Sequence, residues 1–124
     1  MKFSIGILAA GGLVLPFAAT AQQQPDPVQL REFSQAANAF TTCLGATVQM
    51  GMATRMDPPA FREGFAKACI DEQLRFRALA VEMAIAAGKS RVEAEAEIDG
   101  NIVNGRRIYA DDHEQFIRTG RVPK

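Results

Sequence analysis

The chain has 124 residues, with 14 Lys and Arg against 14 Asp and Glu, one His, two Cys and 48% hydrophobic residues. This length fits one domain, and a net charge of zero provides no field to attract a polyanion, which argues against nucleic-acid binding. One His and two Cys exclude a closed four-ligand zinc site made of these side chains, and two Cys exclude a multi-disulfide scaffold.

Residues 1–21 are typical of a secretory signal peptide. Lys2 supplies the positive charge at the start, and the residues that follow it up to Ala21 carry no charge. Ala19 and Ala21 place small side chains at the two positions that a signal peptidase reads. We therefore predict cleavage after Ala21 and export to the periplasm of a Gram-negative bacterium, or secretion. The alternative is an uncleaved leader that anchors the chain in a membrane.

Cleavage would leave residues 22–124, with 13 basic and 14 acidic side chains. We expect residues 22–25 to be a short mobile segment and residues 26–124 to form a single helical domain. In an oxidising compartment an even pair of cysteines indicates a disulfide first, and a redox or metal site second.

The first helix is predicted from Asp26 and Pro27 to about Thr54. Asp26 can cap the free N–H groups, and Pro27 fits the first helical position because its missing N–H costs nothing there. Apolar residues follow at steps of three and four, as a one-sided helix requires: Leu30, Phe33, Ala37, Phe40, Leu44 and Val48.

Asp57, Pro58 and Pro59 repeat this start signal and predict a second helix that continues to Gly88. Its apolar positions cover a broad face, which is typical of a helix in the middle of a bundle. They are Phe61, Phe65, Cys69, Ile70, Leu74, Phe76, Leu79, Val81, Met83 and Ile85.

The last third of the chain predicts two further helices. Ser90 and Glu93 have the spacing of a capping box, so a third helix should begin there. Asn104 and Gly105 favour a break, after which a short fourth helix should run from about Arg106 to Thr119 and end at Gly120. The alternative is one continuous helix, because Ile98, Ile102, Tyr109 and Phe116 could form a single apolar stripe to the end of the chain. The prediction is an all-α bundle of three to four helices.

Cys43 and Cys69 are the pair with the firmest physical argument. Met56, in the predicted turn between the first two helices, lies 13 residues from each of them. Equal arms place the two side chains level across an antiparallel hairpin, and small neighbours would allow the close approach that a disulfide needs. We predict a structural disulfide that staples the first hairpin. A redox-active or metal-binding pair is the alternative, although the Cys-x-x-Cys spacing of redox pairs is missing.

Two other groups of side chains are weaker candidates for metal or catalytic sites. Met50, Met52 and Met56 could bind Cu(I) through their thioethers, whereas methionines at a helix end are more commonly core fillers. His113 follows Asp111 and Asp112, so a metal site or a small hydrolase built around it is conceivable. The alternative for His113 is an exposed side chain among charges at the last helix.

Charged residues of opposite sign gather at different ends of the last third. Glu93, Glu95, Glu97 and Asp99 predict a solvated acidic face. A second set gives the other end a basic character and consists of Arg106, Arg107, Arg118, Arg121 and Lys124. Complementary patches of this kind can serve an unknown protein partner or self-association.

No assembled catalytic set and no cofactor motif is visible, so we expect a non-enzymatic periplasmic binding, inhibitory or chaperone-like protein. The alternatives are a copper-handling protein that uses the methionines and a small hydrolase around His113.

Overall fold

A computed structural model describes residues 24–124 as four α-helices, and this part of the chain contains no β-strand. The predicted all-α bundle is therefore confirmed. The predicted leader, its cleavage point after Ala21 and most of the predicted mobile segment 22–25 lie outside the described residues. Within residues 24–124, no helix combines the length and the apolar character needed to cross a membrane.

Helix α1 comprises Pro27–Ala53, as the sequence predicts. The Asp26 carboxylate accepts a hydrogen bond of 2.9 Å from the Val28 N–H, so the predicted cap is present. The buried face of α1 is formed by residues at helical spacing, namely Ala36, Phe40, Leu44, Val48 and Gly51.

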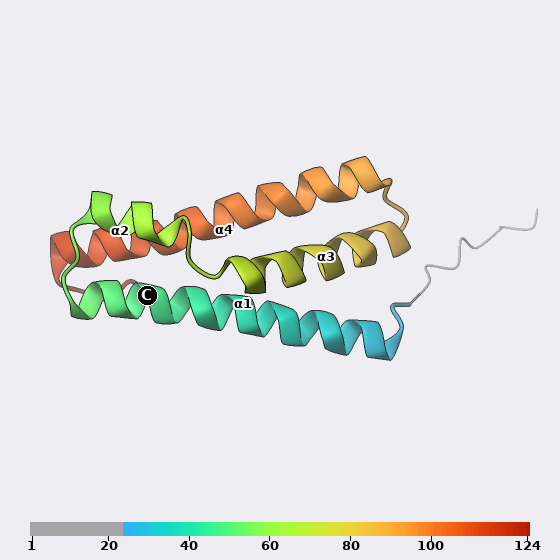
Figure 1. The fold of residues 1–124 in the computed structure, drawn as a ribbon, viewed down its shortest axis with the longest axis horizontal. Coiled ribbons are helices and arrows are strands. Elements are labelled where there is room, and N and C mark those ends of the chain that lie inside the picture. Colours follow the sequence, from blue (N-terminus) through green and yellow to red (C-terminus); the bar gives the residue numbers. More distant parts are fainter. Residues whose placement is uncertain (1–23) are drawn as a thin grey trace, which may run out of the picture.

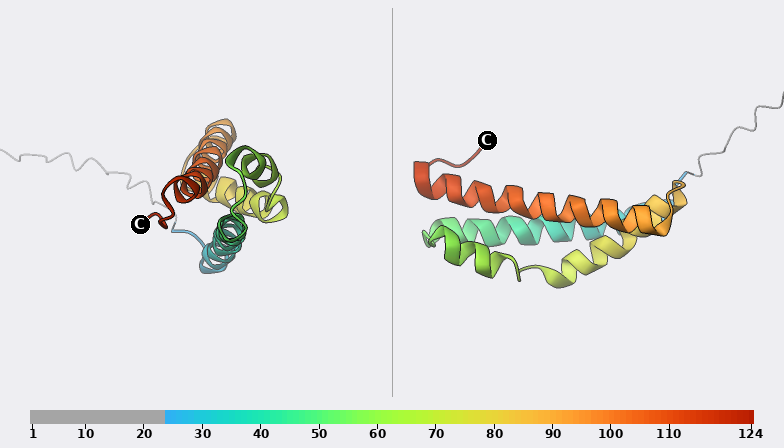
Figure 2. Two further views of the ribbon diagram at one scale, coloured as in Figure 1. Left: turned by 90° about the vertical axis from the view of Figure 1, so that its left-hand side faces the viewer. Right: turned by 90° about the horizontal axis from the view of Figure 1, so that it is seen from above.

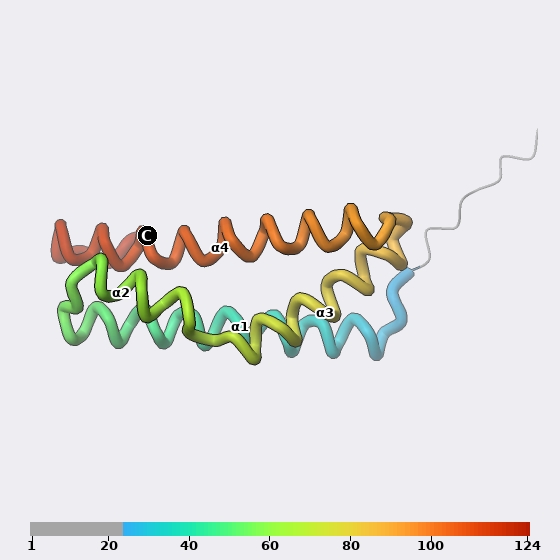
Figure 3. The backbone as a smooth tube through the Cα atoms, turned by 45° about the horizontal axis from the view of Figure 1, so that its top comes forward, coloured from blue at the N-terminus to red at the C-terminus, as the bar shows by residue number. Residues whose placement is uncertain are grey.

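The predicted second helix is in fact two helices, α2 (Pro58–Phe65) and α3 (Ile70–Ala86). The chain turns between them, and Cys69 adopts a left-handed backbone conformation with a φ of 61°. A non-glycine residue in this region is strained by about 1–2 kcal/mol. Figure 3 shows the resulting bend between α2 and α3. The prediction of one continuous helix was wrong because contacts from other helices, described below, hold this turn.

Helix α4 comprises Arg91–Thr119 without interruption, so the predicted break near Gly105 was also wrong. A Cβ atom built on Gly105 would meet nothing within 4 Å, which shows that the glycine serves no close approach. Its intrinsic cost in a helix, about 1 kcal/mol, is outweighed by the buried side chains on both sides of it, such as Ile102 and Ala110.

Both predicted ends of the last third are confirmed. The Ser90 Oγ accepts a hydrogen bond of 3.2 Å from the Glu93 N–H at the start of α4. Gly120 ends the helix in a left-handed conformation, with φ at 68°, and its N–H donates to the Phe116 carbonyl.

The helices form an elongated bundle in which α4 runs beside α1, and α2 and α3 follow one another along the remaining side (Figure 1). The end-on view in Figure 2 shows three columns around a common axis. Helix α3 packs on both α1 and α4, whereas α2 packs mainly on α4. The core consists of Phe40, Leu44, Val48, Phe61, Phe65, Ile102 and Ala110.

The predicted disulfide between Cys43 and Cys69 is present, with Cα atoms 5.9 Å apart. The two neighbouring glycines do not explain this approach, because a Cβ atom added at Gly45 or Gly64 would contact nothing within 4 Å. The turn before α3 brings Cys69 toward α1 instead.

We expect Cys43→Ser to lower the free energy of unfolding by about 3–4 kcal/mol, because the bridge closes a 26-residue separation in the unfolded chain. Urea or thermal unfolding of the oxidised wild type and the variant measures the difference. Two reactive thiols in native, oxidised wild-type protein would contradict the staple.

Gly51 lies in close contact with two rings of the core. An added Cβ atom would lie 2.6 Å from the Phe61 ring and 3.0 Å from the His113 ring. We expect Gly51→Ala to destabilise the chain by about 1–3 kcal/mol through overpacking. Gly45→Ala on the same helix is the matched control, and it should be neutral or stabilising by up to about 1 kcal/mol. Equal effects of the two changes in chemical unfolding would contradict this packing argument.

Candidate functional site

Arg106 forms more hydrogen bonds between helices than its sequence context suggests. The sequence predicts it as part of an exposed basic end of the chain. It is half-buried instead. Its Nη1 donates to the Phe65 carbonyl at 2.8 Å, its Nη2 to the Ala68 carbonyl at 2.5 Å, and its Nε to the Gln73 side chain at 2.5 Å. The guanidinium carbon also lies 5.6 Å from the ring centroids of Phe40 and Phe65, which is within cation–π range.

These contacts explain how the turn between α2 and α3 is held. Carbonyl groups at a helix end lack partners within the helix, and the guanidinium of Arg106 supplies donors to Phe65 and Ala68 there. All three acceptors of Arg106 are neutral, and burial lowers the pKa of its guanidinium from the ordinary value. Among the described residues, no carboxylate forms an ion pair with Arg106.

A shallow hollow of about 280 Å³ opens beside Arg106, between α2 and α4. It is lined by Arg62, Phe65, Ala66, Val103, Arg106, Arg107 and Ala110. The lining therefore combines three guanidinium groups with an apolar surface. Val103 at its edge is 69% exposed, so an apolar contact is available to a partner.

The other two arginines of the hollow are bound to carboxylates of α4. Arg62 contacts Asp111 at 2.9 Å and Glu114 at 2.6 Å, and Arg107 contacts Asp111 at 3.2 Å. The hydrogen bond from Arg62 is the main reason that the pKa of Asp111 is lowered. The hollow and its rim therefore hold three guanidinium groups and two carboxylates. Among the described residues, Arg106 is the arginine of this group that has no carboxylate partner.

This arrangement is suited to binding. A guanidinium group has five N–H donors, of which Arg106 uses three. The remaining two have no partner among the described residues, and a charge-assisted bond from a guanidinium to a carboxylate is stronger than a neutral one. The hollow can therefore accept an acidic group next to an apolar one.

His113 lies in the core and not among surface charges. It is fully buried, with a ring centroid 3.8 Å from that of Phe61 and the two rings stacked. Neither ring nitrogen has a hydrogen-bond partner among the described residues. The interpretation of His113 as an exposed side chain was wrong, and within residues 24–124 no serine, threonine or carboxylate forms a hydrogen bond with its ring.

The three candidate methionines lie at the same end of α1 in different environments. Met50 and Met56 are exposed, whereas Met52 is partly buried against the core. A copper site at these residues stays a prediction from the sequence.

The predicted acidic face is largely exposed, and each of three carboxylates has a basic neighbour. Glu97 pairs with Lys89, Asp99 with Arg77 and Glu95 with Arg91. Of the residues predicted for the basic end, Arg107, Arg118, Arg121 and Lys124 are exposed.

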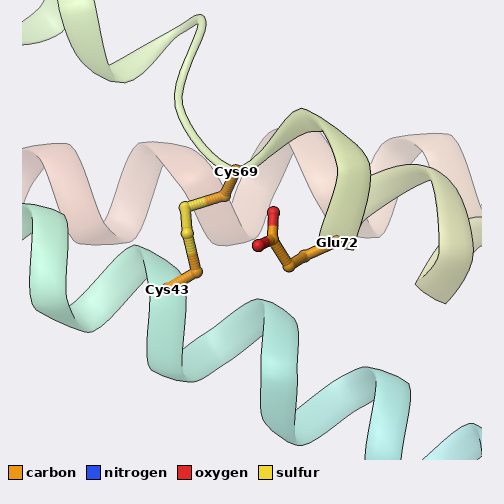
Figure 4. Close-up of side chains that lie close together, drawn as sticks. All are labelled: Cys43, Cys69 and Glu72. Atoms are coloured by element: carbon orange, nitrogen blue, oxygen red, sulfur yellow. A yellow bond between two sulfur atoms is a disulfide. The ribbon is translucent and has the colours of Figure 1, made fainter.

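A second group of ligand-type side chains surrounds the disulfide. The Glu72 carboxylate points toward Cys43 and Cys69 in Figure 4, and one ligand atom from each of the three residues lies within 4.8 Å of the others. The Thr47 hydroxyl is 3.8 Å from the Cys69 sulfur and donates to the Cys43 carbonyl at 2.9 Å. Glu72 is not among the residues predicted for a site, although its position three residues after Cys69 places both near the start of the same helix.

We expect Arg106→Lys to destabilise the chain by about 2–3 kcal/mol, because an ammonium group cannot reach three acceptors in different directions, and partly buried acceptors such as the Ala68 carbonyl lose their donor. Arg107 is the next residue, and its side chain is exposed. Arg107→Lys should therefore change the free energy of unfolding by less than about 0.5 kcal/mol. Urea unfolding of both variants tests the difference. Equal changes in the free energy of unfolding would show that the positive charge of Arg106, and not the shape of its guanidinium group, stabilises the turn.

Comparisons with known proteins give no further guide to the function. No family model, no curated protein and no solved structure matches this chain. Arg106 and the hollow beside it are the features of the chain that bear most directly on its function.

Proposed function

We propose that this chain is an exported, non-enzymatic binding protein that contacts another protein through the hollow between α2 and α4. The observation that carries the proposal is the guanidinium of Arg106, which is half-buried, has no carboxylate partner among the described residues and faces an apolar lining. Buried charges are normally paired. A partner that supplies a carboxylate would complete this site.

The partner's contact segment should be acidic and partly apolar. Its carboxylate would bind the two remaining donors of Arg106, and an adjacent apolar side chain would cover Val103. Arg62 and Arg107 would add positive charge at the rim, where charges mainly steer and orient a partner. The hollow is small and shallow compared with pockets that enclose a small molecule, which favours a protein segment.

Two observations support export. The disulfide between Cys43 and Cys69 is a bond that persists in oxidising compartments and is rare in the cytosol. The sequence of residues 1–21 has the pattern of a cleavable leader. We accordingly assign the protein to the periplasm or the extracellular space, where an inhibitory or chaperone-like role would use the same hollow.

Two exposed valines of α4 provide a matched test of the hollow. Val103 lies at its edge and is 69% exposed, whereas Val92 is 78% exposed and is not part of the lining. Val103→Glu should repel an acidic segment and weaken binding at least tenfold, which is about 1.4 kcal/mol. Val92→Glu introduces the same charge on the same helix and should leave binding unchanged. Immobilised wild type and both variants are compared for capture of periplasmic proteins, followed by titration of the captured protein.

The same three proteins distinguish the possible roles. Protection of an aggregating client by the wild type and by Val92→Glu, with loss of protection in Val103→Glu, would indicate a chaperone-like role at the hollow. Binding of one defined partner would indicate an inhibitory or adaptor role. Equal behaviour of the two variants in every assay would contradict the assignment of the hollow.

A further inference from the structure

Glu72 is a half-buried carboxylate beside the disulfide. It forms no ion pair and accepts no side-chain hydrogen bond within residues 24–124. Its position in the first turn of α3 is favourable for a negative charge, but Asp71 occupies that turn as well and is exposed. The helix end therefore does not explain why Glu72 points at the two sulfur atoms in Figure 4.

We propose that the reduced chain binds one divalent transition-metal ion, with zinc as the best match, through Cys43, Cys69 and Glu72. The ligand atoms already lie within 4.8 Å of one another. Two thiolates and one carboxylate form a ligand set that zinc accepts, with a fourth position left for water. Cys43 and Glu72 are half-buried, so the site can be reached from solvent on their side.

The geometry needs only a small adjustment. Two thiolates on one tetrahedral zinc ion have sulfur atoms about 3.8 Å apart, since each Zn–S bond is about 2.3 Å. The Cα atoms are 5.9 Å apart in the disulfide form, and rotation about the Cα–Cβ bonds can separate the sulfurs without moving the helices. Thr47 is placed to support the site, because its hydroxyl lies 3.8 Å from the Cys69 sulfur.

Charge provides the driving force. Two thiolates and one carboxylate at this separation would bring three negative charges together, which is unfavourable without a cation. A divalent cation offsets this repulsion because its charge stabilises all three deprotonated ligands.

The disulfide form and the reduced, zinc-bound form interconvert in two steps. A dithiol reductant delivers two electrons and two protons, the S–S bond breaks, and the reductant becomes a disulfide. Zinc then displaces both thiol protons and forms two Zn–S bonds. A disulfide oxidant reverses the process: the cysteine sulfurs lose two electrons, the S–S bond forms again and the zinc ion leaves, while the oxidant takes up these electrons with two protons from solvent and becomes a dithiol.

The experiment uses the chain reduced with a phosphine under anaerobic conditions and titrated with Zn²⁺ and Co²⁺. Reduced wild type should bind one ion per chain, with the thiolate-to-cobalt charge-transfer band that marks sulfur ligands. Oxidised wild type and the Cys43→Ser, Cys69→Ser double variant should show no such band. Re-oxidation should release the zinc ion to a chromogenic chelator.

Glu72→Gln and Asp71→Asn separate the ligand from its neighbour. Loss of the Glu72 carboxylate should weaken binding at least tenfold and change the cobalt spectrum, whereas Asp71→Asn should bind as wild type does. Far-UV circular dichroism is recorded throughout, so that a reduced chain which has lost helicity and regains it with zinc counts as binding. No sulfur-ligated metal in reduced wild type, or equal affinities of the two variants, would overturn the proposal.

Discussion

The turn at residues 66–69 is the constraint on which the rest of the structure depends. It is held from two directions, since the disulfide ties Cys69 to α1 and Arg106 binds the carbonyls of Phe65 and Ala68 from α4. Together these contacts offset the strain of a left-handed non-glycine residue at Cys69. Because the chain bends here, α2 can pack on the C-terminal half of α4 while α3 fills the space between α1 and α4. A straight helix over the same residues could not do both.

The elements that the sequence predicted correctly depend on local chemistry or on simple geometry. The caps at Asp26 and Ser90 need only short-range hydrogen bonds. The cysteine pairing was predicted correctly from equal arms of a hairpin, although it is the turn before α3 that brings Cys69 to α1. The two wrong boundaries depend on distant contacts. Ala66 and Ala68 favour a helix, so nothing local announces the turn that Arg106 holds. At Gly105 the local signal fails in the opposite direction. Glycine disfavours a helix, yet α4 continues through it because the neighbouring residues pack against the core.

The candidate site was missed for a related reason. His113 and Arg106 stand among charged residues along the chain, which suggests a surface, but adjacent residues on a helix point in different directions. Arg106 lies four residues from both Ile102 and Ala110, and His113 lies three residues after Ala110; Ile102, Ala110 and His113 are buried and Arg106 is half-buried. That spacing was a usable signal for both. The hollow itself was beyond reach, because it requires knowing that α2 lies against α4.

The proposed hollow and the proposed metal site are linked through the same turn. Phe65 and Arg106 line the hollow, and their positions depend on where Cys69 attaches to α1. Reduction of the disulfide removes that attachment and should loosen the turn, which would keep its own backbone hydrogen bonds and those from Arg106. A zinc ion on Cys43, Cys69 and Glu72 would restore a connection between the same two segments at nearly the same separation. The two oxidation states can therefore present the same binding surface, provided that the reduced state carries its metal.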